Sequence, residues 1–400
     1  MTSPIKRIDG VTLSDKRVLM RADLNLPVQD GLVSDWTRLE RCTPTIRHII
    51  DRGGQVVLLS HFGRPAGQYD PQLSFKELLP QIRDKLALSC ELLDHRGELP
   101  LASLNAQQEI ADVLLVDNTR FFSGETTGDQ TLSRAIAELG DCFCLDAFSV
   151  SHRNHTTVTG LASFLPSFAG FSLADELDAL NATLATIGRP CVAIVGGAKV
   201  STKIDVLRNL IPKTDTLIVG GGMANTFLKA IGYEIGSSLV EDDQLSTARE
   251  IMQFADSFDC ALVLPTDVAT HHTFASTDKA LVCDIKDVGE SAMILDFGPT
   301  SMASIKGIVS SAKTLLWNGP LGAFEIIPFE IASVEVAKFV ANRCASGELK
   351  AVAGGGDTLA LLAKAGVSDD FTFCSTGGGA FLEWLEGKKL PGLSILSTVS

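Results

Sequence analysis

Two lysines close to a pair of glycines form the first stretch of the sequence that could do chemistry. An apolar run at 192–195 stops at Gly196 and Gly197, and Lys199 and Lys203 follow, one helical turn apart. Glycines let backbone N–H groups approach a phosphate, and the start of the following helix favours negative charge. The stretch therefore predicts an anion site, although a strand followed by two glycines is also typical of an ordinary tight turn.

The same form recurs at four more apolar runs in the second half of the chain. The glycine-rich segments that end these runs are 220–222, 318–320, 354–357 and 376–379. In an open parallel sheet, strand ends of one polarity lie along one edge, and ligands bind in the crevice there. If these glycine-rich segments meet at one crevice, their common pattern is explained better than by four unrelated turns.

In the first half, the apolar runs are followed by loops that offer Asp, Asn, His or Arg. These loops are 23–27, 61–65, 117–122 and 149–157. Residues 1–170 carry 13 of the 17 Arg, whereas residues 171–400 carry 13 of the 17 Lys. Arg binds carboxylate and phosphate bidentately, and Lys acts as a point charge on phosphates. The first half therefore suits a small acidic metabolite and the second half a nucleotide, with chance and surface salt bridges as the alternative.

Composition limits the class of protein. A chain of 400 residues with 45% hydrophobic and 20% charged residues can bury a large core, and its length favours two domains. The net charge of −14 argues against nucleic acid or an anionic membrane as partner. The N-terminal residues lack the apolar region of a signal peptide, so we expect a cytoplasmic protein. The nine Cys include no C-x-x-C pair, which predicts reduced and mostly buried thiols.

Strands that alternate with helix-length segments set the predicted fold. The first half has strands near 17–23, 56–60, 113–116 and 142–148, with helices at 37–52 and 74–88. An amphipathic helix at 172–187, followed by Gly188 and Pro190, is expected to connect the halves. The second half has strands near 192–195, 216–219, 261–264, 314–317, 351–353 and 371–375. We predict an α/β protein with two doubly wound domains, each with a mainly parallel sheet covered by helices on both faces, separated by a cleft.

Several familiar motifs are absent from the sequence. It contains no G-x-x-x-x-G-K-[ST] phosphate loop, and no G-x-G-x-x-G follows a strand, which disfavours P-loop enzymes and dinucleotide-dependent oxidoreductases. No layout of a nucleophilic Ser or Cys with His stands out. The chemistry must therefore come from residues distributed over several loops.

Eight motifs, in order along nearly the whole chain, resemble phosphoglycerate kinase. They are RADLNLP at 21–27, HFGRP at 61–65, DAFSVSHR at 146–153, GGAKVSTKI at 196–204, GGGMANTFL at 220–228, WNGPLGAFE at 317–325, GGGDT at 354–358 and STGGGAFLEWLEGKKLPG at 375–392. The resemblance implies reversible phosphoryl transfer between ATP and the carboxylate of 3-phosphoglycerate, giving 1,3-bisphosphoglycerate and ADP. It also implies a monomer in which a hinge closes two domains on the reactants.

The resemblance assigns a role to each part of the chain. It implies a phosphoglycerate-binding domain at 1–170, a connector helix at 171–189, a nucleotide-binding domain at 190–380 and a C-terminal segment at 381–400 that returns to the first domain. The residues implied to bind the phosphoglycerate are Asp23, Leu24, Asn25, Arg38, His61, Phe62, Gly63, Arg64, Arg120 and Arg153. Asp23 and Asn25 would contact the glycerate portion, and the cationic residues would surround the phosphate and carboxylate.

The resemblance also implies a site for Mg-nucleotide in the second half. The residues implied to bind the nucleotide are Gly196, Gly197, Lys199, Lys203, Gly221, Asn318, Glu325, Gly355, Gly356, Asp357 and Thr358. Within this set, Lys203 would meet the α- and β-phosphates, Glu325 the ribose and Asp357 a magnesium ion. The implied catalytic groups are Arg38, Lys199, and the backbone N–H groups of Gly356 and Gly378. Because the attacking carboxylate is already an oxyanion, no general base is required.

The sequence departs from the family pattern at a few positions, and some residues have a structural alternative. The departures are Leu145 for Asn, Ser149 for Gly, Asp117 and Thr119 before Arg120, and Phe297 in the Asp-Ile-Gly-Pro slot. Arg21 could instead pair with a buried carboxylate, Asp23 or Asp146. A non-catalytic protein of the same fold and a kinase for another small acceptor are the competing functional hypotheses, but no charged group that the reaction needs is missing.

Overall fold

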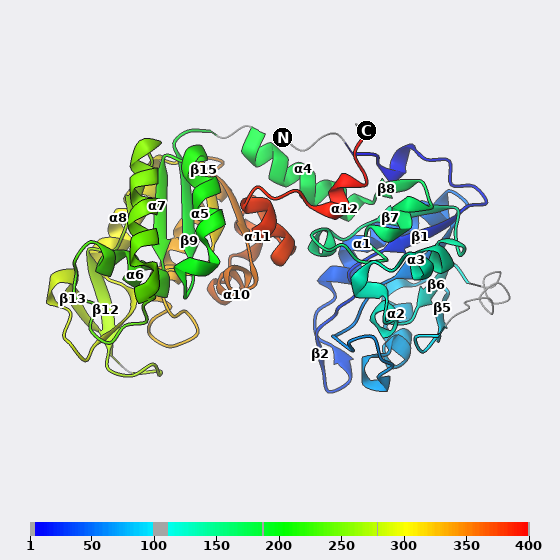
Figure 1. Ribbon diagram of the computed structural model, residues 1–400, viewed down its shortest axis with the longest axis horizontal. Coiled ribbons are helices and arrows are strands. Elements are labelled where there is room, and N and C mark those ends of the chain that lie inside the picture. Colours follow the sequence, from blue (N-terminus) through cyan, green and yellow to red (C-terminus); the bar gives the residue numbers. More distant parts are fainter. Residues whose placement is uncertain (1–4, 99–110, 186–187, 278, 399–400) are drawn as a thin grey trace. The chain divides into compact units, whose positions relative to one another are not determined.

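Two six-stranded sheets form the frame of the chain (Figure 1). The computed structural model describes residues 5–98, 111–185, 188–277 and 279–398. The chain divides into a first unit, Met1–Asp178 with Lys389–Ser400, and a second unit, Ala179–Lys388. Each unit holds one of the sheets, whose strands are all parallel. The predicted α/β class with two parallel sheets is therefore confirmed.

In the first unit the strand order is β5-β6-β4-β1-β7-β8. The strands are β1 (Arg17–Arg21), β4 (Gln55–Leu59), β5 (Cys90–Leu93), β6 (Val113–Val116), β7 (Cys142–Leu145) and β8 (Ser167–Ala169), and the helices are α1 (Thr37–Asp51), α2 (Leu79–Leu86) and α3 (Gln130–Ala137). Every residue of β6 and β7 is buried, as expected for strands covered on both faces. Because β6, β4, β1 and β7 are successive neighbours, the loops after their carboxyl ends share one edge of the sheet.

Two short elements complete the first unit. A small hairpin is formed by β2 (Val28–Gln29) and β3 (Leu32–Val33). The C-terminal residues include α12 (Pro391–Ser394), where the backbone N–H of Gly392 donates to the carbonyl of Ser151 at 2.8 Å. The N–H of Lys6 donates to the carbonyl of Leu396 at 2.9 Å. Residues from both ends of the chain thus belong to the first unit.

The helix predicted at 74–88 is wrong in its extent. The segment Phe75–Glu77 is a 3-10 turn, and the α-helix α2 runs only from Leu79 to Leu86. Pro80 lies in the first turn of α2, where its missing N–H removes no helical hydrogen bond, so the α-helix begins just before it. Ala87 ends α2 in a left-handed conformation, with φ of 52°.

The helix predicted between the halves is present as α4 (Phe171–Ala185). Leu173, Leu177 and Leu180 are buried, in agreement with an amphipathic helix. The last two residues of the predicted range, 186–187, lie outside the described part of the chain. The buried carboxylate of Asp146 accepts the N–H of Leu173 at 3.1 Å and so stabilises the first turn of α4.

In the second unit the strand order is β11-β10-β9-β15-β16-β17. The strands are β9 (Cys191–Gly196), β10 (Thr216–Gly220), β11 (Ala261–Val263), β15 (Thr314–Asn318), β16 (Lys350–Gly354) and β17 (Phe373–Ser375), and the helices are α5 (Ile204–Leu210), α6 (Gly222–Ala230), α7 (Leu245–Ser257), α8 (Pro299–Ser311), α9 (Ile331–Ala345), α10 (Gly356–Ala365) and α11 (Gly379–Leu385). One core cluster joins β9 and β15 to apolar side chains of α8, α9 and α10. Ends of β10, β9, β15 and β16 are again neighbours along one edge.

A second sheet in this unit was not predicted. It is antiparallel, in the order β13-β12-β14, with β12 (Asp267–His271), β13 (Leu281–Asp284) and β14 (Met293–Phe297). Leu281 and Val282 in β13 are half exposed, so β13 lacks the continuous burial that marks strands of the parallel sheets. The sequence gives no alternating pattern there from which a strand could be predicted.

Some expectations from composition can be compared with the structure. All nine Cys are free thiols, and six of them are buried. Within the described ranges, no helix is long and apolar enough to cross a membrane.

Asp296 is a buried carboxylic acid that connects β14 to α9. Its side chain is 3% exposed, and Oδ2 accepts the N–H of Ala332 at 2.9 Å in the first turn of α9. Burial raises the pKa of Asp296 to about 8. In the unfolded chain this carboxyl has an ordinary pKa near 3.8, so the folded protein holds a proton that the unfolded chain has lost between these two pH values.

We predict that this group makes the protein less stable as the pH rises from about 4 to about 8. The Asp296→Asn variant should lose less of its unfolding free energy than the wild type between pH 5 and pH 8, by about 1 kcal/mol or more, since one pKa unit corresponds to about 1.4 kcal/mol. Urea unfolding of both proteins at the two pH values measures the difference. Asp242→Asn, at an exposed site, is the matched control. Equal pH dependence in Asp296→Asn and the wild type would contradict the prediction.

Candidate active site

The site in the first unit begins at the carboxyl end of β1, where Asp23 holds Arg38. Arg38 Nη1 donates to Asp23 Oδ1 at 3.0 Å and to the carbonyl of Asn25 at 2.9 Å. Asp23 Oδ1 also accepts the N–H of Asn25 at 3.1 Å, and Oδ2 accepts from Ser149 Oγ at 2.6 Å. Burial opposes ionisation of Asp23, but the charge of Arg38 and the hydrogen bonds from Ser149 and Asn25 lower its pKa. The pair is thus charged and oriented from β1, α1 and the loop after β7.

Two asparagines set the shape of the loop after β4. Asn25 Oδ1 accepts the N–H of Gly63 at 2.8 Å. Asn118, at the end of β6, accepts the N–H of Phe62 at 3.1 Å and donates to the carbonyls of Phe62 and Leu73 at 2.5 and 2.9 Å. Asn118 was not among the predicted site residues, although a polar residue directly after a strand end is the kind of signal that could have identified it.

Three arginines come from loops at this edge of the sheet: Arg64 follows β4, Arg120 follows β6 and Arg153 follows β7. Arg120 Nη1 donates to the carbonyl of Gly63 at 2.7 Å. Burial lowers the pKa of Arg120, and the positive charges of Arg21, Arg64 and Arg153 lower it further, against the opposing charge of Glu125. In the described part of the chain, Arg64, Arg120 and Arg153 form no ion pair within 4.0 Å, and two or more guanidinium groups held together without a counterion favour a polyanion.

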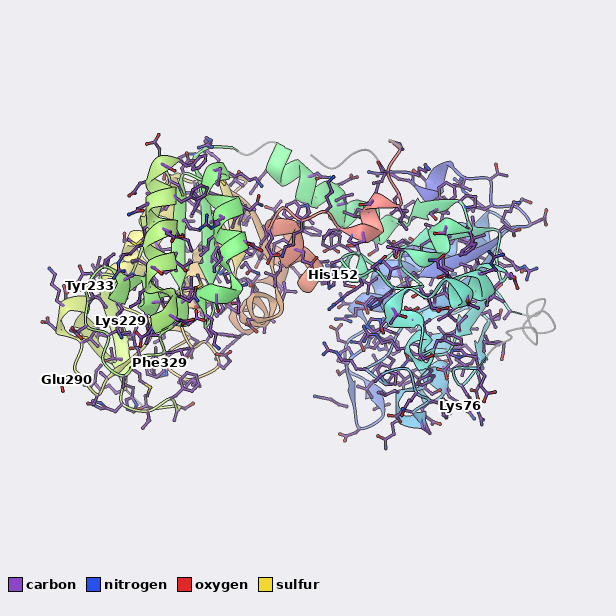
Figure 2. The ribbon with its side chains drawn as sticks, in the orientation of Figure 1. Lys76, His152, Lys229, Tyr233, Glu290 and Phe329 are labelled. Atoms are coloured by element: carbon purple, nitrogen blue, oxygen red, sulfur yellow. The ribbon has the colours of Figure 1, made fainter. Side chains whose placement is uncertain are left out.

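The other predicted residues of this loop cluster differ in what they can offer. Leu24 is fully buried, and its backbone N–H donates to Ser60 Oγ at 2.8 Å, so its side chain belongs to the core. Phe62 packs against Phe75 with ring centroids 5.7 Å apart. Burial and the charge of Arg153 lower the pKa of His152 (Figure 2) to about 4. Burial and the charges of the neighbouring arginines lower the pKa of His155 to about 4 as well, so both imidazoles are neutral at pH 7.

The residues that differ from the family pattern each have identifiable surroundings in the structure. Ser149 binds Asp23, as described above, and Leu145 is buried at the end of β7. Asp117 is buried and accepts Ser74 Oγ at 2.7 Å and the N–H of Phe75 at 2.8 Å. Phe297 lines the pocket of the second unit. None of these residues removes a charged group from either site.

In the second unit, glycines are required where neighbouring strand ends touch. Gly319, at the end of β15, has φ of +96°, and a Cβ there would lie 2.1 Å from the carbonyl oxygen of Gly196. Gly221 has φ of +67°, and its Cβ would lie 2.7 Å from the carbonyl oxygen of Gly197. Side chains at these positions are therefore excluded by both conformation and space. The glycines pack the strand ends closely in addition to exposing the backbone to a ligand.

A pocket of about 250 Å³ opens beside these glycines. Its walls come mainly from apolar side chains and glycine backbone, and three acidic side chains, Asp296, Glu325 and Asp357, lie at its lining. The apolar members include Leu239, Met293, Leu295, Phe297, Leu321 and Ala323. Such a lining suits a flat, mostly uncharged ring, with polar groups to orient the remainder of the ligand.

Lys203 is held by a hydrogen bond to Asn318, at the end of β15. Lys203 Nζ donates to Asn318 Oδ1 at 2.5 Å, and Asn318 Nδ2 donates to the carbonyl of Gly354 at 2.7 Å. Thr358 Oγ1 accepts the N–H of Gly319 at 2.7 Å and donates to Gly354 at 2.9 Å, so this buried hydroxyl orders the loops. Burial lowers the pKa of Lys203, and the charges of Asp357 and Glu386 oppose that shift.

Helix N-termini at this edge are free of side-chain caps. Helices α6, α10 and α11 follow Gly221, Gly355 and Gly378, which make no side-chain cap hydrogen bond. In α6 the N–H groups of Met223 and Ala224 donate to the carbonyls of Gly197 and Gly221 at 2.9 and 3.0 Å, and in α11 the N–H of Ala380 donates to the carbonyl of Gly377 at 2.9 Å. Among the described residues, the first N–H groups of α10 have no such partner and remain available to an anion. A Cβ at Gly356 or Gly378 would meet no atom within 4 Å, so the space above these two residues is open.

Asp357 fits the needs of a magnesium ion bound together with a nucleotide. It is exposed in the first turn of α10 and, among the described side chains, forms no ion pair within 4.0 Å. Mg²⁺ commonly takes one or two protein carboxylates and completes its shell with phosphate oxygens and water. No group of three potential metal ligands occurs in the described residues. Lys199 is also exposed and unpaired within the same described set.

The chain is similar to known proteins over almost all of its length. A family model described as phosphoglycerate kinase matches residues 8–388. The phosphoglycerate kinase of Sinorhizobium fredii is 50% identical over 400 residues, covering 98% of each chain. That of Maricaulis maris is 48% identical over 390 residues, covering 98% of this chain and 97% of the relative.

Solved structures give the same result. The phosphoglycerate kinase of Coxiella burnetii matches with a TM-score of 0.88 at 38% identity, over 98% of this chain and 99% of the other. The Pyrococcus horikoshii phosphoglycerate kinase matches with a TM-score of 0.80 at 26% identity, over 98% of both chains. Sequence motifs, family model and relatives agree over both units, and the chain belongs to the phosphoglycerate kinase family.

Proposed function

We propose that the protein transfers a phosphoryl group reversibly between ATP and the carboxylate of 3-phosphoglycerate. The observation that carries the proposal is the group of Arg64, Arg120 and Arg153, which follow β4, β6 and β7 at the edge of the sheet that also holds the oriented pair of Asp23 and Arg38. Among the described residues, these three arginines form no ion pair within 4.0 Å. A phosphorylated carboxylic acid supplies the two anionic ends that such a cluster can bind. Membership of the family supports the same substrate.

The nucleotide is assigned to the second unit. Gly197, Gly221 and the apolar pocket would hold the base, with Glu325 near the ribose. Lys203 and the uncapped N-termini of α10 and α11 would bind the phosphates. Asp357 would hold magnesium, which when bound neutralises charge on the phosphate oxygens.

Catalysis in this proposal consists of positioning and charge neutralisation. The carboxylate of the acceptor attacks directly, so no protein group has to remove a proton. Arg38 and Lys199 would neutralise the transferring group, and the N–H groups of Gly356 and Gly378 would add fixed donors. In-line transfer brings both reactants together in a space from which water is excluded, so the proposal includes closure of the two units. We further propose a cytoplasmic monomer.

An assay with the full-length chain tests the activity. With ATP, 3-phosphoglycerate and magnesium, we expect ADP to form at a rate that depends on both substrates and stops when EDTA removes the metal. A panel of other small carboxylates should give little or no ADP. MgATP binding without ADP formation would contradict the proposal and favour a non-catalytic protein of the same fold.

Arg38→Ala is predicted to remove turnover while nucleotide binding persists. We expect kcat to fall by about 10²–10³, as for loss of one preorganised donor at a reacting oxyanion, with the Kd for MgATP unchanged. Arg52→Ala is the matched control, because Arg52 follows the last residue of the same helix, α1, and its exposed side chain donates to the carbonyl of Asp9 at 3.2 Å. Stopped-flow kinetics and calorimetry measure the two quantities. Equal loss in both variants would mean that the effect is on the fold.

Lys203→Ala and Asp357→Asn are predicted to act on the nucleotide side alone. Each should raise the KM for MgATP by about tenfold or more, since a charge-assisted hydrogen bond contributes about 1.5–3 kcal/mol, and Asp357→Asn should also raise the magnesium requirement. The Kd for 3-phosphoglycerate should not change. Lys229→Ala is the control, because Lys229 (Figure 2) pairs with Asp242 at an exposed site at 2.6 Å. A weakened 3-phosphoglycerate Kd would contradict this division of roles.

A further inference from the structure

We infer that Arg21 is a positioning residue: held by Thr157 and Glu125, it binds Nδ1 of His61 and leaves that imidazole as a neutral donor, with its proton on Nε2 directed to an anionic oxygen of the substrate. The identity of the acceptor as 3-phosphoglycerate rests on the proposed function. The state of His61 does not depend on it.

The contact between Arg21 and His61 determines where the imidazole proton lies. Arg21 Nη2 and His61 Nδ1 are 3.0 Å apart, and both side chains are buried, at 1% and 7% exposure. A guanidinium carries only donors, so a hydrogen bond between these atoms requires Nδ1 to be the acceptor. A proton on Nδ1 would instead place two donors face to face. The neutral imidazole therefore carries its proton on Nε2.

A buried network fixes Arg21 in this position. Its Nε donates to Thr157 Oγ1 at 3.1 Å, and its Nη1 donates to the carbonyl of Ala22. Thr157 in turn donates from Oγ1 to Glu125 Oε1 at 2.5 Å and from its backbone N–H to Oε2 at 3.1 Å. Glu125 is 1% exposed, so the carboxylate and the guanidinium compensate each other away from water. Glu125, which the sequence did not suggest, is thus linked to Arg21 through Thr157, and the charge of Asp23 also acts on Arg21, whereas that of Asp146 does not.

The groups around His61 also oppose a charged imidazole. Burial and the positive charge of Arg21 lower the pKa of His61 to about 2, and Arg120 and Arg38 act in the same direction against Asp23. His61 therefore supplies a hydrogen-bond donor and no charge at neutral pH. Within the described residues no group bonds to His61 Nε2, which leaves this N–H available to a ligand.

The arrangement separates Arg21 from the arginines that face the ligand. Arg64 and Arg153 have no carboxylate partner within the described chain, whereas Arg21 is almost completely buried and its donors face protein atoms. Arg21 thus acts on the substrate through His61. A direct substrate contact by Arg21 would require the network with Thr157 and Glu125 to break.

Nitrogen NMR of the full-length protein, labelled with ¹⁵N in its seven histidines, tests the inference. The His61 resonances are identified by their loss in His61→Gln. We expect an unprotonated Nδ1 and a protonated Nε2 at every pH from 5 to 8. His95 is the internal reference, because its Nδ1 accepts the N–H of Gly97 at 2.8 Å and its Nε2 lies 3.0 Å from the carbonyl of Asp117, which sets the same tautomer through unrelated partners.

The variant Arg21→Met combined with Glu125→Gln removes both charges of the buried pair, so neither is left unpaired. In this variant we expect His61 to become a mixture of tautomers and to titrate closer to the ordinary value near 6.5, while His95 keeps its state. The KM for 3-phosphoglycerate should rise about tenfold, as expected for one misdirected hydrogen bond to a charged group, with the KM for MgATP unchanged. Thr157→Val, which cuts the link between Arg21 and Glu125, should produce a smaller change of the same kind and serves if the double variant does not fold.

The outcomes separate this inference from the proposed function. A wild-type His61 that carries its proton on Nδ1, or that titrates between pH 5 and 8, would overturn the inference even if the protein is an active kinase. The inference would also be overturned if the His61 tautomer were unchanged both in the double variant, Arg21→Met with Glu125→Gln, and in the single variant Thr157→Val. The expected tautomer in a protein that shows no turnover with 3-phosphoglycerate would support the inference for His61 and reject the proposed substrate.

Discussion

The parallel alignment of the strands is the constraint on which both sites depend. When neighbouring strands run in one direction, their carboxyl ends and the loops after them lie at one edge. In the first unit this places the loops after β1, β4, β6 and β7 together, and in the second unit the loops after β10, β9, β15 and β16. Residues far apart in the sequence become neighbours for this reason, and neither site contains a continuous catalytic motif.

At each edge, the polar residues fall into those that order the loops and those that remain available to a ligand. In the first unit, three buried residues form hydrogen bonds with other groups of the protein: Asn118, Thr157 and Arg21. In the second unit Asn318 and Thr358 do the same between β15 and β16. Unsatisfied buried polar groups are costly, so these networks restrict the loops to few conformations.

The charges that face solvent are of the kind that bind anions. Arginines beside Asp23 and Arg38 lie at the first edge, and Lys199, Lys203 and uncapped helix starts lie at the second. Because an anionic acceptor needs no base, such an arrangement suits the proposed phosphoryl transfer. It also explains why a protein with a net charge of −14 can bind anionic metabolites, since local charge at the site decides binding.

Much of this could be predicted from the sequence. Apolar runs that end in glycine or in polar loops predicted two parallel sheets, and the motifs predicted the family, because both depend on residues near each other in the chain. The helix predicted at 74–88 is too long because Pro80 begins the α-helix only at Leu79. The antiparallel sheet of β12, β13 and β14 was not predicted because its strands lack the continuous burial of the parallel strands.

The sequence by itself determined the class of fold, the family and the residue types at the strand ends. Only the tertiary structure decided which of those residues form their hydrogen bonds with other protein groups and which remain available to a ligand. Arg21 ends the apolar strand β1, and Arg64 lies in the loop after β4. Arg21 is linked to Glu125 through Thr157, whereas Arg64 forms no ion pair among the described residues. The difference depends on burial and on contacts between residues more than a hundred positions apart, such as Arg21 and Thr157. Contacts between such distant residues leave no local pattern in the sequence.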